Sequence, residues 1–162
     1  MLPVIIIAMR FDWVYIALSL YAIATLSDFF DGYLARKLGQ VSDFGKFLDP
    51  IADKIFIAAI LLILADMDRL EGLWMIPAIV ILVREFLISG LREFLGPKNI
   101  TVPVSKLAKW KTTLQMIALG LLIAAPLSGL WLWSGHIMLS VAAVLTVITA
   151  KEYLSIGLKH LD

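Results

Sequence analysis

The sequence predicts an all-α integral membrane protein, and three observations lead to that prediction. Apolar residues make up 61% of the 162 residues, the mean hydropathy is +0.94, and the apolar residues gather in long runs. Soluble domains are typically about 45–50% apolar. The excess indicates that a bilayer surrounds much of the chain, so we expect membrane lipids among its partners.

Five apolar segments approach the length of about 20 residues that a membrane-spanning helix needs. They are residues 14–38, 46–65, 73–95, 104–126 and 131–158. A sixth run, residues 2–9, would extend only about 12 Å as a helix, whereas the hydrocarbon core is roughly 30 Å thick. We therefore expect the first helix to be truncated. The connections are short and no repeat is found, which favours a single domain over residues 1–162.

The cations lie unequally at the two sets of helix ends. Of the 14 Lys and Arg residues, only Arg10 and Arg69 fall near one set. Since cytoplasmic ends carry the excess of Lys and Arg, the other set, which includes Arg36 and Lys46, should face the cytoplasm. The net charge of +1 gives no indication of a nucleic-acid partner, and we expect none.

Four aspartates interrupt two consecutive apolar segments. Asp28 and Asp31 are three residues apart, and Asp49 and Asp53 are four apart, so each pair should share one helical face. Ionised groups inside a spanning helix are unfavourable by roughly 2.5 kcal/mol or more each. Asp28 should lie roughly 15 Å and Asp53 roughly 10 Å from the cytoplasmic helix ends. All four can therefore meet in one cavity that faces the cytoplasm.

A bound divalent cation would offset the repulsion among these carboxylates. The chain has no cysteine, which excludes thiolate ligands, and oxygen ligands favour Mg²⁺ or Mn²⁺. The predicted metal ligands are Asp28, Asp31, Asp49 and Asp53. Gly32 and Gly45 flank the group and would let a ligand approach the backbone, although both could equally serve helix packing.

The segment reads Asp28-Phe-Phe-Asp31-Gly32-Tyr-Leu-Ala35-Arg36, then eight residues, Gly45, three residues, Asp49, three residues and Asp53. This pattern resembles, without a mismatch, the signature of the CDP-alcohol phosphotransferase family. The resemblance implies six transmembrane helices, usually in a homodimer, with one or, more typically, two divalent metal ions and Asp53 as the catalytic general base. It also implies that the CDP moiety is surrounded by Asp28, Gly32, Ala35, Arg36, Gly45 and Asp49.

Residues 84–94 and 105–116 are similar to the bacterial branch of this family that makes phosphatidylglycerophosphate. That resemblance implies transfer of the phosphatidyl group from CDP-diacylglycerol to glycerol 3-phosphate, with release of CMP, at the cytoplasmic face of a bacterial inner membrane. The candidates to hold the acceptor phosphate are Arg84, Arg92, Lys109 and Lys111. Arg84 should lie roughly 18 Å deep, where a cation needs an anionic partner. An ion pair with Glu85 is the alternative explanation for Arg84.

Other functions share some of these sequence features. The same chemistry could use inositol phosphate, serine or phosphatidylglycerol as acceptor. Acids within membrane helices also mark ion transporters, but transport favours acids along a path across the bilayer. A prenyltransferase would need an Asp-Asp-x-x-Asp motif, which is absent from the signature segment. Ion pairs of Asp31 with Arg36 and of Asp49 with Lys46 would give the aspartates a purely structural role.

Overall fold

The computed structural model describes residues 1–38, 43–96 and 106–158. Within these ranges, residues 28–38, 43–47, 49, 50, 106, 152 and 156–158 are described as backbone only. The α-helices of the described ranges are α1 Leu2–Arg10, α2 Val14–Leu38, α3 Asp43–Asp66, α4 Met75–Leu95, α5 Lys106–Ile123 and α6 Gly129–Leu158. Two 3-10 turns, η1 Gly72–Trp74 and η3 Ala125–Leu127, complete them. These ranges contain no strand, which confirms the all-helical prediction.

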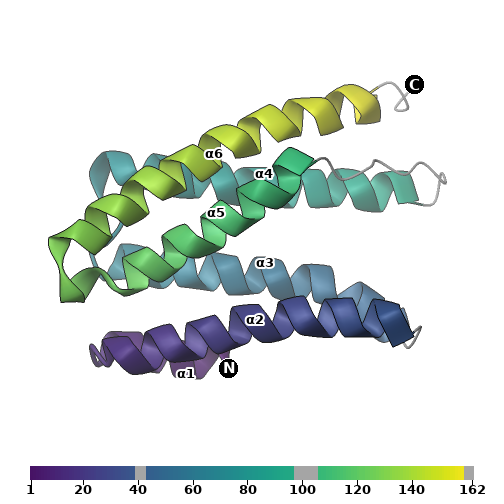
Figure 1. The fold of residues 1–162 in the computed structure, drawn as a ribbon. Helices are drawn as coiled ribbons and strands as arrows, with labels where there is room; N and C mark the ends of the chain where they lie inside the picture. The colour runs from purple at the N-terminus through teal and green to yellow at the C-terminus, as the bar shows by residue number, and fades with distance from the viewer. Residues whose placement is uncertain (39–42, 97–105, 159–162) are drawn as a thin grey trace.

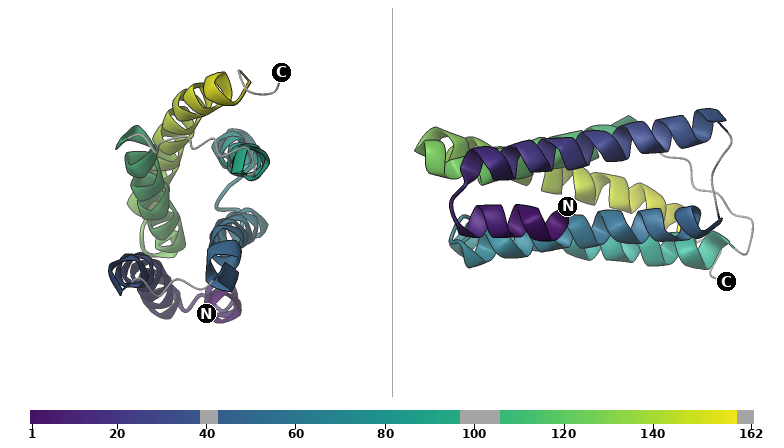
Figure 2. Two further views of the ribbon diagram at one scale, coloured as in Figure 1. Left: turned by 90° about the vertical axis from the view of Figure 1, so that its right-hand side faces the viewer. Right: turned by 90° about the horizontal axis from the view of Figure 1, so that it is seen from below.

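The five long helices run along a common direction, while α1 covers only part of that length (Figure 1). Helices α2, α4 and α6 finish at the same end of the bundle, where α3 and α5 begin (Figure 1). We call this the cation-rich end, because the sequence places all Lys and Arg residues except Arg10 and Arg69 toward it. Seen along the bundle, α4 and α3 lie on one side and α5 and α6 on the other (Figure 2).

The helix bounds agree closely with the predicted segments. Helix α2 has the predicted bounds, and α6 begins two residues before the predicted start. Helix α5 ends three residues before the predicted limit at Pro126, which instead lies in the turn η3. Proline has no backbone N–H to donate within a helix, so a change of conformation near it is expected.

Two helical stretches among the described residues are long and apolar enough to cross a membrane, Gly72–Leu95 and Gly129–Ser155. Val14–Ser27 is apolar but shorter. Helix α5 is 18 residues long and carries Lys106, Lys109 and Lys111 in its first two turns. The sequence-based count of six spanning helices therefore stays a prediction.

Helices α5 and α6 pack so closely that one glycine is required between them. A Cβ added at Gly135 would lie 2.8 Å from the Leu122 side chain and 3.2 Å from its backbone nitrogen. Three alanines that are buried in the same region, Ala118, Ala142 and Ala143, continue the pattern of small residues. Small residues let helix backbones approach within a membrane, where lipid supplies little hydrophobic drive for association.

Arg69 joins three segments at the end opposite the cation-rich one. Its guanidinium donates hydrogen bonds to the carbonyls of Leu122 (3.3 Å) and Ile123 (3.0 Å), at the end of α5. It also pairs with Asp12 at 3.4 Å, and its own carbonyl is 2.8 Å from the His136 ring. Burial lowers the pKa of the Arg69 guanidinium, and Asp12 opposes that shift. Arg69 thus satisfies helix-end carbonyls that would otherwise lack partners.

Candidate active site

A cavity of about 180 Å³ lies between α3, α4, α5 and α6, in the half of the bundle near the cation-rich end. Its lining residues are Lys54, Arg84, Glu85, Ile88, Ser89, Arg92, Ala108, Lys111, Thr112 and Tyr153. The charged members are four cations and one acid. Such an excess of positive charge in a concave site attracts anions.

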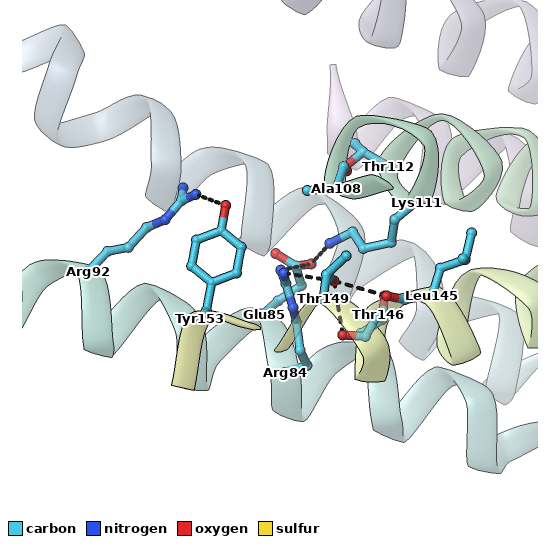
Figure 3. A network of polar contacts seen from close by, with 10 residues as sticks. All are labelled: Arg84, Glu85, Arg92, Ala108, Lys111, Thr112, Leu145, Thr146, Thr149 and Tyr153. Atoms are coloured by element: carbon cyan, nitrogen blue, oxygen red, sulfur yellow. Dashed lines mark hydrogen bonds and ion pairs between the residues drawn. The ribbon is translucent and has the colours of Figure 1, made fainter. Parts of the chain in front are cut away.

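Glu85 is the acid of the cavity, and two cations contact it. Lys111 on α5 donates a hydrogen bond to the Glu85 carboxylate, and Arg84 on α4 pairs with the same oxygen at 3.2 Å. The three side chains converge in Figure 3. Their exposed fractions are only 5% for Lys111, 11% for Arg84 and 19% for Glu85. One carboxylate therefore balances two largely buried cations, so one positive charge is left uncompensated within this trio.

Arg84 also reaches α6. Its Nη2 donates a hydrogen bond of 3.3 Å to the Thr149 hydroxyl, which in turn donates to the backbone carbonyls of Leu145 and Thr146 (Figure 3). The Nε of Arg84 is buried and has no hydrogen-bond partner in the described part of the chain. An unsatisfied donor on a buried guanidinium is unfavourable, which indicates that Arg84 is suited to a further acceptor.

Arg92 lies two turns after Arg84 along α4 and contacts a tyrosine of α6. Its Nη2 donates a hydrogen bond of 2.8 Å to the Tyr153 hydroxyl (Figure 3). The guanidinium carbon of Arg92 lies 5.0 Å from the centre of the Tyr153 ring, and that of Arg84 lies 5.7 Å from it. The Tyr153 side chain is therefore the common neighbour of both arginines.

The cavity gathers three of the four residues that the sequence suggested for the acceptor phosphate. Arg84, Arg92 and Lys111 line it, whereas Lys109 is exposed and is not among the lining residues. The ion pair of Arg84 with Glu85, weighed as the alternative, also exists. Sequence reasoning missed Lys54, although its place directly after Asp53 was a usable signal. Tyr153 carried no such signal, because its residue type and spacing match no motif in the sequence.

The predicted catalytic aspartates lie on continuous helices. Asp28 and Asp31 belong to α2, and Asp49 and Asp53 to α3, so the helical spacing that puts each pair on one face is present. The two helices run in opposite directions (Figure 1), and the Tyr21 ring of α2 stacks on Phe56 of α3 at 5.9 Å.

Of the four predicted metal ligands, Asp53 is the one whose side chain the structure describes. The Asp53 side chain is exposed. The other predicted metal and CDP contacts are described as backbone only. They are Asp28, Asp31, Gly32, Ala35, Arg36, Gly45 and Asp49. Among the described side chains no three His, Asp or Glu residues gather. The backbone is nevertheless compatible with a divalent cation, because both aspartate pairs lie in helical segments that lead to the same end of the bundle. Carboxylate oxygens are also the ligands that suit Mg²⁺ or Mn²⁺.

Comparison with known proteins agrees with this arrangement. The family model described as CDP-alcohol phosphatidyltransferase matches residues 1–148. A CDP-diacylglycerol–glycerol-3-phosphate 3-phosphatidyltransferase of Rickettsia felis is 49% identical over 137 residues, which cover 83% of this chain and 74% of that protein. The enzyme of the same name from Pseudomonas fluorescens is 37% identical over 169 residues, covering 99% and 86%. That from Haemophilus influenzae is 38% identical over 152 residues, covering 88% and 77%. The signature of α2 and α3, the family match and these identities together place the chain in the CDP-alcohol phosphatidyltransferase family.

Proposed function

We propose that this chain transfers the phosphatidyl group of CDP-diacylglycerol to glycerol 3-phosphate, which yields phosphatidylglycerophosphate and CMP. The assignment of glycerol 3-phosphate as the acceptor rests on the cavity, which is lined by four cations and one acid. One of these cations, Lys54, directly follows Asp53 in the sequence. The relatives named above act, by their names, on the same two substrates. The proposal assigns the lipid substrate to the aspartate helices and the acceptor phosphate to the cavity.

The cavity has the chemistry to hold a phosphate monoester. Arginine presents a planar fork of donors that can bind two phosphate oxygens at once, and lysine adds a compact charge. Arg84, Arg92 and Lys111 line the cavity from two helices, and Lys54 from a third. An acceptor without a phosphate, such as serine or glycerol, would leave Arg84 and Lys111, which are both largely buried, to share the single carboxylate of Glu85. The cavity therefore favours glycerol 3-phosphate over such acceptors.

Asp53 serves in this proposal as the general base. As the primary hydroxyl of glycerol 3-phosphate attacks the phosphorus that carries the diacylglycerol, its proton passes to the Asp53 carboxylate. A new bond forms between that phosphorus and the acceptor oxygen. The bond from the same phosphorus to the anhydride oxygen breaks, and CMP leaves with the electron pair. Arg36 would stabilise the charge that develops on CMP, and the cations of the cavity would hold the attacking hydroxyl in line.

The donor site in this proposal is formed by Asp28, Gly32, Ala35, Arg36, Gly45 and Asp49. The residues proposed to hold two divalent ions, Mg²⁺ or Mn²⁺, are Asp28, Asp31, Asp49 and Asp53. When bound, these ions would neutralise the diphosphate and the leaving group. The backbone positions of both aspartate pairs support this assignment.

The proposal includes the setting of the enzyme. The chain would act as a multi-pass protein of a bacterial inner membrane, as a single domain over residues 1–162 and as a homodimer. The cation-rich end would face the cytoplasm, where glycerol 3-phosphate is dissolved. Two apolar helical stretches support the membrane setting, and the excess of cations at one end supports that orientation.

The test is a CMP-release assay with the purified chain in mixed micelles that contain CDP-diacylglycerol and Mg²⁺. Glycerol 3-phosphate, glycerol, serine and inositol phosphate are offered separately at equal concentration, and the Asp53→Asn variant is the negative control. We expect release with glycerol 3-phosphate to exceed that with every other acceptor. Faster release with serine or inositol phosphate would reject the acceptor while the reaction class stands. No CMP release with any acceptor would reject the reaction.

A further inference from the structure

Tyr153 lies between the two arginines of the cavity and is itself almost fully buried. Its side chain is on α6, with 2% of the residue exposed, and it packs with Ile88 of α4 and Ala150 of α6. Its hydroxyl accepts the 2.8 Å hydrogen bond from Arg92. Its ring faces both guanidinium groups, at 5.0 Å for Arg92 and 5.7 Å for Arg84. One rigid side chain thus contacts two cations by two kinds of interaction (Figure 3).

These contacts matter because an arginine side chain is long and has many rotamers. Fixing such a side chain at the moment of binding costs rotamer entropy. A partner that already holds the guanidinium removes part of that cost before the ligand arrives. Arg92 is exposed, and in the described part of the chain the hydrogen bond and the ring contact to the buried Tyr153 restrict it. Arg84 is restricted further by Glu85 and Thr149.

We propose that Tyr153 is a positioning residue for the acceptor, which orders the guanidinium of Arg92, and more weakly that of Arg84, to receive the phosphate of glycerol 3-phosphate. The inference rests on the proposed function of the cavity. Tyr153 does not contact the reacting atoms; it acts through the arginines. The hydroxyl fixes the direction of Arg92, and the negative face of the ring stabilises both cations where they lie.

A purely structural role for Tyr153 would have different consequences. The ring also packs α6 against α4 through Ile88, so its loss would loosen the bundle. Loosening alone would lower the unfolding temperature and affect donor and acceptor kinetics alike. Positioning through Arg92 instead predicts a selective loss of acceptor affinity, which disappears when Arg92 is already gone.

The experiment is a double-mutant cycle with Tyr153→Phe and Arg92→Ala, measured as Michaelis constants for both substrates. Phenylalanine keeps the ring and removes the hydroxyl, so the core stays filled. A hydrogen bond to a charged group is worth roughly a tenfold change in affinity at the low end of its range. We expect Tyr153→Phe to raise KM for glycerol 3-phosphate about tenfold while KM for CDP-diacylglycerol stays nearly constant. In the Arg92→Ala background, Tyr153→Phe should have no further effect.

Tyr21→Phe is the matched control. Tyr21 is also buried, and its hydroxyl donates a 2.9 Å hydrogen bond to the Met116 carbonyl, between α2 and α5. The same chemical change there should alter the unfolding midpoint without a selective change in the acceptor KM. A second variant, Tyr153→Leu, also removes the ring contact and should raise the acceptor KM beyond the level of Tyr153→Phe.

The outcomes separate the two proposals. If Arg92→Ala leaves the acceptor KM unchanged, the phosphate site of the proposed function is wrong. If Arg92→Ala raises that constant but Tyr153→Phe does not, or if the two effects simply add, the positioning role of Tyr153 is overturned. A selective and non-additive rise supports it.

Discussion

The ammonium of Lys111 on α5 donates a hydrogen bond to the carboxylate of Glu85 on α4, and this contact joins two helices at the wall of the cavity. Glu85 also pairs with Arg84, so it is the acid among the described side chains that holds two cations of the cavity in place. The anionic partner that Arg84 was expected to need is thus present within the chain.

Glu85→Gln should destabilise the protein. The change leaves the Lys111 side chain, which is 5% exposed, without its ionic partner. Removing one member of a buried ion pair costs roughly 3–5 kcal/mol, and the partial exposure of Glu85 should place the loss at or below the lower end. The unfolding midpoint in detergent, followed by tryptophan fluorescence, measures it. Glu93→Gln, an exposed site two turns further along α4, is the control. Equal midpoints for both variants would contradict the prediction.

Arg84→Ala should raise KM for glycerol 3-phosphate about 10- to 100-fold, the range for losing a hydrogen bond between charged groups. KM for CDP-diacylglycerol should change far less. Lys109→Ala provides a comparison on α5, because Lys109 is exposed and does not line the cavity. Steady-state CMP release at varied concentrations of each substrate gives both constants. A larger acceptor effect at Lys109 than at Arg84 would refute the assignment of the cavity.

Asp53→Asn should lower kcat by about 10²- to 10⁴-fold, the usual contribution of a general base. The amide keeps the shape of the carboxylate but cannot accept the proton, so binding of CDP-diacylglycerol should be largely retained. Single-turnover CMP release and equilibrium binding of the lipid distinguish the two effects. Asp66→Asn, at the other end of α3 and paired with Arg10, is the matched control. Near-normal turnover of the Asp53 variant would remove Asp53 as the base.

Chelation of divalent cations should abolish transfer, and either Mg²⁺ or Mn²⁺ should restore it. Four carboxylates gathered from two consecutive helices would otherwise repel each other and the diphosphate of the donor. The measurement is CMP release after exhaustive treatment with EDTA, followed by titration of each metal. Full turnover after chelation would disprove the metal requirement.

Gly135→Ala should destabilise the contact between α5 and α6. The added Cβ would lie within 3.2 Å of the Leu122 backbone nitrogen, which cannot move away as a flexible side chain could. Overpacking of this kind costs about 1–3 kcal/mol. Gly90→Ala is the control, because nothing lies within 4 Å of a Cβ at that position. A shared shift of the unfolding midpoint in both variants would show that the helix contact is not the cause.

The sequence alone determined the helices, the aspartate pairs and the chemistry they suggest. Long apolar runs define α4 and α6, the two helices that are long and apolar enough among the described residues to cross a membrane, because a helix in lipid must satisfy its own backbone hydrogen bonds. The spacing of Asp28 with Asp31, and of Asp49 with Asp53, needs only local helical geometry to place each pair on one face. These features depend on residues a few positions apart, which is why they could be predicted.

Only the tertiary structure decided which cations share the cavity. Lys109 and Lys111 are two residues apart, so they point in directions that differ by about 200° around α5. The packing of α5 and α4 against α6 brings Lys111 within reach of Glu85 and leaves Lys109 exposed. Likewise, Tyr153 meets Arg92 across 61 residues of sequence, through the contact of α6 with α4. Such a contact depends on the rotation of one helix against another, which the local sequence pattern does not specify.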